Sequence, residues 1–220
     1  MRAILWTSIA LAIGVDGTAG HADEKAYLIV FASQRENPKL PRFAHTFATF
    51  VQIGKAGGKE RIETQTISWL PQSMKIAPKL RPEAGRNVSL PETLKWVEAQ
   101  GERVIAWGPF QVKKELYDLA QAQVQRLEKG GIGYRMIDGK RRPQALNCIH
   151  AVSDTDTTRP PLETGPAFGE AASQAVLRHF ERWLIQPQVT HREIAERLGL
   201  NKHRIEYAPS TQERGGVRIK

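Results

Sequence analysis

The sequence predicts an α+β protein in which an antiparallel sheet packs against helices. Strand-like segments cluster early in the chain, at 26–32, 43–53 and 61–69, and helix-like segments dominate after residue 110. This segregation favours the α+β class, because a doubly wound parallel sheet needs strands and helices that alternate along the chain. No internal repeat is visible.

The first 22 residues have the pattern of an export signal. Arg2 supplies a positive charge, the stretch 3–15 is mostly apolar, and the small residues Gly20 and Ala22 stand at positions −3 and −1 of a cut after Ala22. The apolar stretch is shorter than the ~20 residues that span a bilayer. An uncleaved anchor or a buried first strand is the alternative. We expect an exported protein, periplasmic or extracellular, with no transmembrane segment once the signal is removed.

The cut would leave 220 − 22 = 198 residues, which is enough for one domain with a real core. We expect this domain to cover 23–208, including a C-terminal helical hairpin, and the tail 209–220 to be disordered. The formal charge of +9 predicts attraction to polyanions. Export favours anionic lipid or acidic cell-wall polymer over nucleic acid, and simple solubility is the alternative.

The first half of the chain reads as strands followed by a loop. The continuous apolar run 26–32 is typical of a buried strand. Segments 43–53 and 61–69 flank Gly57 and its neighbouring glycines, so we expect a β-hairpin. The long, basic, proline-rich segment 71–91 predicts a loop that serves as a lid or substrate wall.

A second group of elements follows this loop. Ser89, with Glu92 three residues later, predicts a capping box that starts a short helix ending at Gly101. A strand is expected at 103–107. The remaining expected elements are a helix at 111–128, a short strand at 133–138, a helix that starts at Asn147 and an amphipathic helix at 168–184.

Cys148 is the only cysteine, so no intramolecular disulfide can form. A single cysteine in an exported chain is a buried small hydrophobe, an intermolecular link or a reactive thiol. Asn147 is a good N-cap residue and would place Cys148 in the first turn of a helix. The free amides and the positive dipole end of that turn would favour a thiolate.

A reactive thiol also needs a base, and two histidines are candidates. His150 lies two residues after Cys148, so a helix would turn it to the opposite face. His45 is the better candidate, because it lies on an expected strand that the fold can bring to Cys148. A solvent-facing or core histidine is the alternative for His45.

Two segments carry a family resemblance. NCIHAV, around Cys148, and AHTFATFVQIG, around His45, resemble motifs of the circularly permuted branch of the papain-like NlpC-type superfamily, which includes relatives of lecithin–retinol acyltransferase. In that branch a histidine strand and a hairpin precede the Asn-Cys helix by about a hundred residues, and here the separation is 148 − 45 = 103. The similarity covers residues 43–154.

The resemblance implies a permuted papain-like fold with Cys148 as nucleophile and His45 as base. It implies a thiol hydrolase or acyltransferase that cleaves amide or ester bonds, with cell-wall peptides as the first substrate class and lipid acyl groups as the second. A non-catalytic binding module on the same fold is the alternative. A third polar residue usually faces the histidine, and a turn centred between Ala56 and Gly57 would place Ser68 there. Serine orients imidazole weakly, and a register slip would bring Thr66 or Gln65 to this position.

The segment 190–205 resembles a helix-turn-helix. Its expected second helix is cut short by Pro209, so we expect a structural hairpin, and DNA binding is the less favoured alternative. Six scattered histidines and one cysteine give no metal-ligand spacing. No phosphate loop or GxSxG elbow occurs, so no cofactor is expected.

Overall fold

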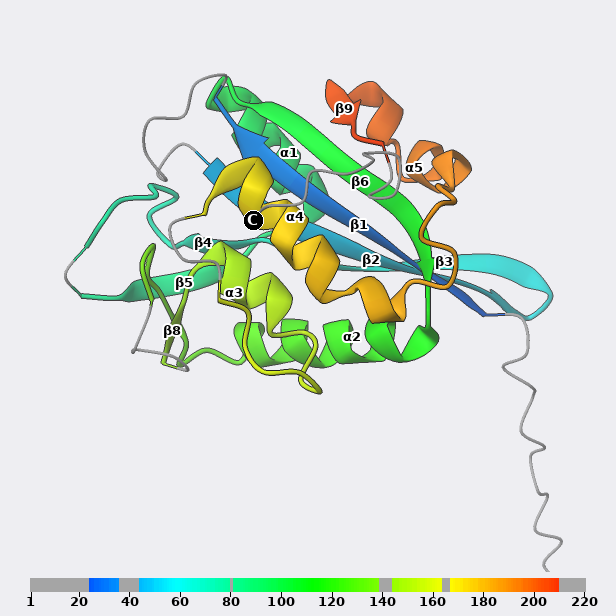
Figure 1. Cartoon of the computed structure of the whole chain (residues 1–220), viewed down its shortest axis with the longest axis horizontal. Helices are drawn as coiled ribbons and strands as arrows, with labels where there is room; N and C mark the ends of the chain where they lie inside the picture. The colour runs from blue at the N-terminus through cyan, green and yellow to red at the C-terminus, as the bar shows by residue number, and fades with distance from the viewer. Residues whose placement is uncertain (1–23, 36–43, 80, 139–143, 164–166, 210–220) are drawn as a thin grey trace, which may run out of the picture.

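The computed structural model describes residues 24–35, 44–79, 81–138, 144–163 and 167–209 (Figure 1). The expected signal segment 1–22 and the tail residues 210–220 lie outside the described residues. Within the described ranges, no helix is both long enough and apolar enough to span a bilayer.

The described strands form two sheets. The larger sheet has the order β3-β2-β1-β6-β9, and the smaller sheet has the order β4-β5-β7-β8. The strands are β1 Lys25–Gln34, β2 Ala44–Ala56, β3 Lys59–Ile67, β4 Trp69–Pro71, β5 Glu83–Asn87, β6 Arg103–Val112, β7 Gly133–Tyr134, β8 Ala145–Leu146 and β9 Ile205–Tyr207. The helices are α1 Leu90–Ala99, α2 Lys114–Glu128, α3 Cys148–Ser153, α4 Gly169–His179, η3 Glu181–Trp183, α5 Arg192–Arg197 and η4 Leu200–Lys202.

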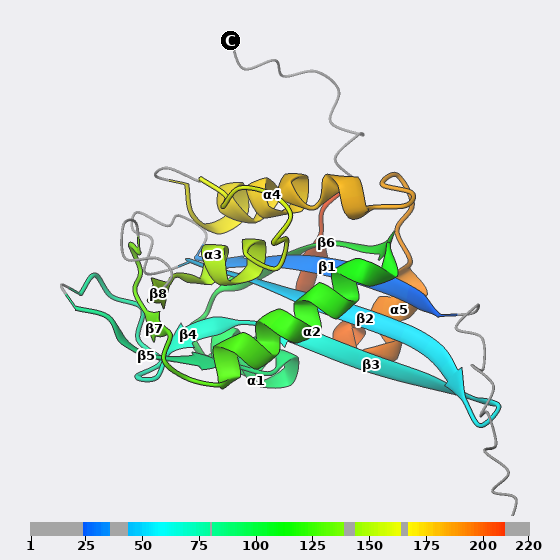
Figure 2. The same cartoon turned by 90° about the horizontal axis from the view of Figure 1, so that it is seen from below.

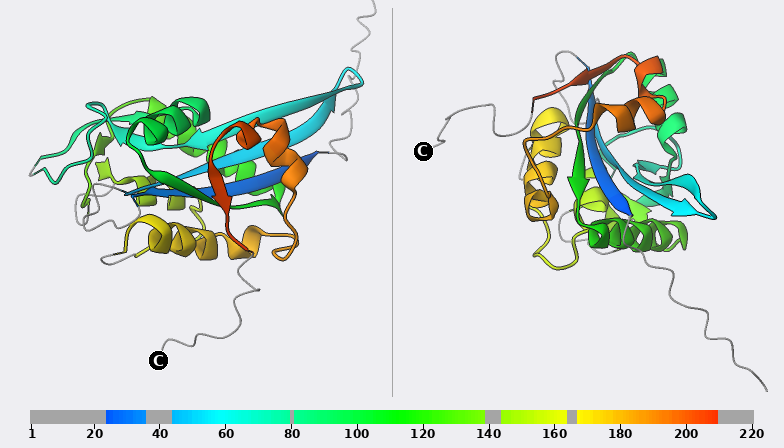
Figure 3. Two further views of the ribbon diagram at one scale, coloured as in Figure 1. Left: turned by 90° about the horizontal axis from the view of Figure 1, so that it is seen from above. Right: turned by 90° about the vertical axis from the view of Figure 1, so that its right-hand side faces the viewer.

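The large sheet separates two helical layers. Alternating side chains of β1 divide between the layers, because successive residues of a strand point to opposite faces. Leu28 and Val30 pack with residues of α2, α3 and α4, whereas Ile29 and Phe31 pack with residues of α1 and α5. Figures 2 and 3 show the same arrangement, with α4 and α5 on opposite sides of the sheet.

The predicted hairpin is confirmed, but its register differs by two residues. Ala56 pairs with Lys59, so the turn centres between Gly57 and Gly58, both of which have positive φ. Glycine adopts this conformation without a steric penalty. A shift of two residues preserves which side chains share a face. The predicted capping box of Ser89 and Glu92 is also present at the start of α1.

Four expected boundaries are wrong. The strand predicted at 103–107 continues to Val112 through an irregularity in its pairing with β1, and Gly108 at φ 99 absorbs the distortion. Helix α2 therefore starts at Lys114 and not at residue 111. The helix predicted at 168–184 ends at His179 and is followed by the short 3-10 helix η3. The strand predicted at 133–138 is limited to Gly133–Tyr134.

The α+β class is confirmed, but the sheets are mixed and not purely antiparallel. β1, β2, β3 and β6 pair antiparallel, whereas β9 joins β6 in parallel and β8 joins β7 in parallel. β9 was not predicted, because its three residues carry too short a pattern to indicate a strand. A parallel neighbour needs a long crossover connection, which the helices between β6 and β9 provide.

Candidate functional site

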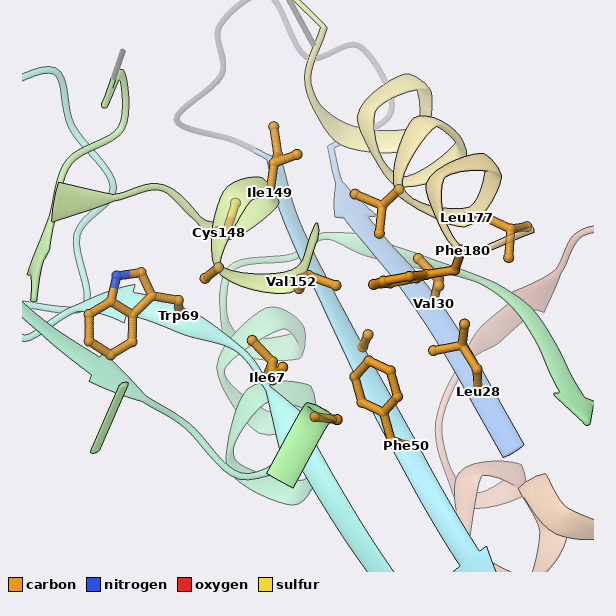
Figure 4. Packing of buried hydrophobic residues seen from close by; sticks show 14 of the residues in the cluster. Leu28, Val30, Phe50, Ile67, Trp69, Cys148, Ile149, Val152, Leu177 and Phe180 are labelled. Carbon is orange, nitrogen blue, oxygen red and sulfur yellow. The ribbon is translucent and has the colours of Figure 1, made fainter. Parts of the chain in front are cut away.

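Cys148 is the first residue of α3 and is almost fully buried. The Asn147 side chain accepts a hydrogen bond from the His150 amide at 2.8 Å, so Asn147 is the N-cap that the sequence predicts. Cys148 is a free cysteine with 7% of its surface exposed. Figure 4 shows it among buried hydrophobic neighbours that include Trp69 and Val152.

This environment keeps the thiol protonated. Burial raises the pKa of Cys148 to about 11, and the negative charge of Asp138 acts in the same direction. The backbone amides of Thr46 and Ile149 favour the thiolate but do not overcome burial. At pH 7 a thiol with this pKa is ionised in only about one molecule in ten thousand.

His45 lies on β2 and contacts the third residue that the resemblance implied. Its Nε2 is 2.9 Å from the Ser68 hydroxyl, although Ser68 stands between β3 and β4 and not directly opposite His45 in a ladder. His45 Nδ1 is buried and has no hydrogen-bond partner among the described residues. The structure therefore brings His45 and Ser68 together, but through a single neutral hydrogen bond.

The surroundings of His45 are aromatic. Its ring stacks on Phe47 at 5.5 Å between centroids and meets the edge of Trp96 on α1 at 5.8 Å. Burial lowers the pKa of His45 to about 3. The imidazole is thus neutral at pH 7, and no described acid supports its protonated form.

The structure does not bring His45 and Cys148 together. His45 shares its face of β2 with Phe47, which packs with the α1 layer. Cys148 packs in the other layer, with Ala48 and Phe50 of the same strand. The hydrogen bonds of the described residues include none between the His45 ring and Cys148.

Sequence reasoning missed a pair formed by a histidine and an aspartate, His150 and Asp138, at the start of α3. His150 Nδ1 lies 2.5 Å from Asp138 Oδ2, and the same carboxylate oxygen accepts from the Asn147 amide at 2.9 Å. His150 Nε2 is buried without a hydrogen-bond partner among the described residues. Helical periodicity correctly separates His150 from Cys148, but no local pattern indicates that Asp138, which follows β7, returns to the start of α3.

Sequence reasoning also did not identify a group of basic residues that lies at one end of the molecule. Lys75, Lys79 and Arg81 lie on the connection between β4 and β5, and Arg135 directly follows β7; we call these four residues the basic end. Glu83 pairs with Tyr134, so Arg81, two residues before β5, and Arg135, directly after β7, lie at the same end of these two strands. Lys79 forms an ion pair with Glu83 at 2.6 Å, whereas Lys75, Arg81 and Arg135 have no ion-pair partner among the described residues.

The other functional alternatives considered from the sequence, DNA binding and metal binding, find no support among the described residues. The segment 190–205 contains a six-residue helix and one 3-10 turn before it leads into β9, so its second element is too short to be a recognition helix. Among the described residues, no three His, Cys, Asp or Glu side chains gather in a way that would hold a metal ion.

Comparison with known proteins identifies no relative: no protein-family profile, curated protein or solved structure matches the chain.

Proposed function

We propose that the chain is an exported, non-catalytic binding module that attaches to anionic material of the cell envelope. The observation that carries the proposal is the separation of Cys148 and His45 into opposite layers of the fold. A thiol enzyme needs its nucleophile and base within hydrogen-bond reach.

The proposal includes a permuted papain-like fold of NlpC type. Its support is the order of elements: the His45 strand, the hairpin β2–β3, and a short helix that opens with Asn147 and Cys148. The same order places Cys148 against the sheet that carries His45. Folds are often shared by active and inactive relatives, so this order does not require catalysis.

Anionic material is the expected partner because of charge. The chain has 32 basic and 23 acidic residues. At the basic end, three cations lack an ion-pair partner among the described residues, and the nearby Asp138 is buried at 3% exposure. The outward charge of this surface is therefore positive, which favours a polyanion.

The test is sedimentation of the chain without residues 1–22 together with isolated cell-envelope fragments at increasing salt. Replacing Lys75, Arg81 and Arg135 by Gln should weaken binding about a hundredfold, since each cation near an anionic surface contributes ~1 kcal/mol. The matched control replaces the exposed Lys25, Lys59 and Lys202 by Gln, with the same change in charge. Equal losses in both variants would contradict a localised site, and no binding by the wild type would contradict the function itself.

The Asp138–His150 pair supports a second candidate, a thiol hydrolase or acyltransferase acting on cell-wall peptides or lipid acyl groups. Asp138 orients His150, and the free Nε2 would be the base if the first turn of α3 rearranged to bring the His150 ring to the Cys148 thiol. Acylation of Cys148 by p-nitrophenyl acetate near pH 7, lost in His150→Ala and retained in His45→Ala, would establish this candidate in place of the binding module.

A further inference from the structure

The basic end carries the most exposed large hydrophobic side chain among the described residues. Ile137 is 69% exposed, against 49% for Ile185 and 36% for Val189. It stands two residues after Arg135, on the segment that leaves β7. An isoleucine in this position contributes nothing to the core, so its exposure has no structural explanation within the fold.

The strand register places Ile137 beside the free cations. Glu83 pairs with Tyr134, so continuing the antiparallel register brings Arg81 level with the segment that holds Ile137. On the other side, Gln72 donates its amide to Ala84, so the connection that carries Lys75 and Arg81 begins and ends beside the small sheet. An exposed aliphatic side chain thus lies at the same end of the small sheet as Lys75, Arg81 and Arg135.

The acidic groups of this surface do not cancel its charge. Glu83 is engaged by Lys79 at 2.6 Å, and Asp138 is buried against Asn147 and His150. Figures 1 and 2 place the small sheet at one end of the molecule, away from the tip of the β2–β3 hairpin. The described residues of this end can therefore meet a surface without the β2–β3 hairpin intervening.

We propose that the basic end docks on an anionic lipid bilayer, with Lys75, Arg81 and Arg135 at the headgroups and Ile137 inserted at the acyl boundary. The proposal rests on the proposed function and names its partner. A soluble anionic polymer would satisfy the cations but would leave Ile137 in water. A bilayer satisfies both, because membrane-surface sites combine basic residues with apolar side chains that enter the interface.

Sedimentation with vesicles tests the proposal, using the chain without residues 1–22. Vesicles of phosphatidylglycerol and phosphatidylcholine should bind the protein, and vesicles of phosphatidylcholine alone should not. Replacing Lys75, Arg81 and Arg135 by Gln should weaken binding about a hundredfold. Ile137→Ser should weaken it about tenfold, because it removes most of one buried aliphatic side chain.

Ile185→Ser is the matched control, since Ile185 is exposed but follows η3 at the far end of α4. It should leave binding unchanged, and thermal unfolding should show that all variants are folded. Equal effects of Ile137→Ser and Ile185→Ser would overturn the docking site. Binding to envelope fragments without binding to anionic vesicles would overturn the bilayer as partner while leaving the proposed function intact. Failure to bind either would remove both.

Discussion

Burial acts on Cys148 and His45 in opposite directions and leaves both uncharged. Removing a group from water disfavours its charged form, so the pKa of a thiol rises and the pKa of an imidazole falls. The pKa of Cys148 is raised to about 11 and that of His45 is lowered to about 3. A working thiolate–imidazolium pair needs the reverse order of pKa values, with the thiol ionising below the imidazolium.

Alkylation of Cys148 by iodoacetamide should follow this order. At pH 8 the native protein should react at least about a hundredfold more slowly than the denatured chain, since burial raises the thiol pKa from 9.0 to about 11. The rate should climb as pH approaches 11, because only the thiolate reacts. The measurement is the pH dependence of labelling, followed by mass spectrometry.

The His45→Ala variant makes this measurement decisive. His45→Ala should leave the labelling profile unchanged, because His45 makes no described contact with the thiol. A shift of that profile to higher pH in His45→Ala, or rapid labelling of the wild type near neutral pH, would instead indicate a functional dyad.

At the scale of elements, the two strands β4 and β5 that flank the basic end approach each other through one close contact, between a glycine and a tryptophan. Gly85 on β5 lies against the indole of Trp69, and a Cβ at Gly85 would overlap the ring. Trp69 is 1% exposed and belongs to the core, so its ring has nowhere to move. The absence of a side chain at Gly85 therefore allows β5 to approach β4.

Gly85→Ala should destabilise the fold by about 2–4 kcal/mol, because overpacking of a rigid core is costly. The measurement is the urea midpoint. Gly54→Ala is the control: its Cβ meets only the flexible Glu24 side chain, so we expect a loss below about 1 kcal/mol. Equal losses of stability in the two variants would show that replacing a strand glycine is costly through the backbone alone, and not through the contact with Trp69.

Elements with strong local signals were predictable, and those that depend on tertiary context were not. The hairpin follows from apolar strands flanking Gly57, and the start of α1 follows from Ser89 and Glu92. The extension of β6 beyond Gly108 was unpredictable, because Gly-Pro normally ends a strand. Here the pairing with β1 and the amides of Ile185 and His191 on the other edge maintain it.

For the whole molecule, the sequence predicts the α+β fold class but not which side chains the fold brings together around Cys148. Clustering of strands and helices indicated α+β, and the N-cap role of Asn147 was correct. The face on which His45 lies depends on the orientation of the whole β2 strand relative to α3, which one sequence does not specify. Asp138 reaches His150 through the turn after β7, and this too has no local pattern.

We predict that the whole chain is exported and that its first 22 residues are removed. The charged start, the short apolar stretch and the small residues before Asp23 predict cleavage after Ala22. N-terminal sequencing of protein recovered from the envelope should therefore begin near Asp23. Recovery of soluble cytosolic protein that retains Met1 would contradict export and would leave the basic end without access to the proposed surface.

The parallel pairing of β9 with β6 has a consequence for biosynthesis. Val104 to Ala106 pair with β1 on one side, and among the described residues their other side is paired only by Ile205 to Tyr207, about a hundred residues later. Until those residues leave the ribosome, β6 presents an open edge of unpaired amides and carbonyls, which is the kind of edge that recruits strands from other chains. A nascent or C-terminally shortened chain should therefore be more prone to aggregation than the full chain, because this edge of β6 stays open until β9 covers it.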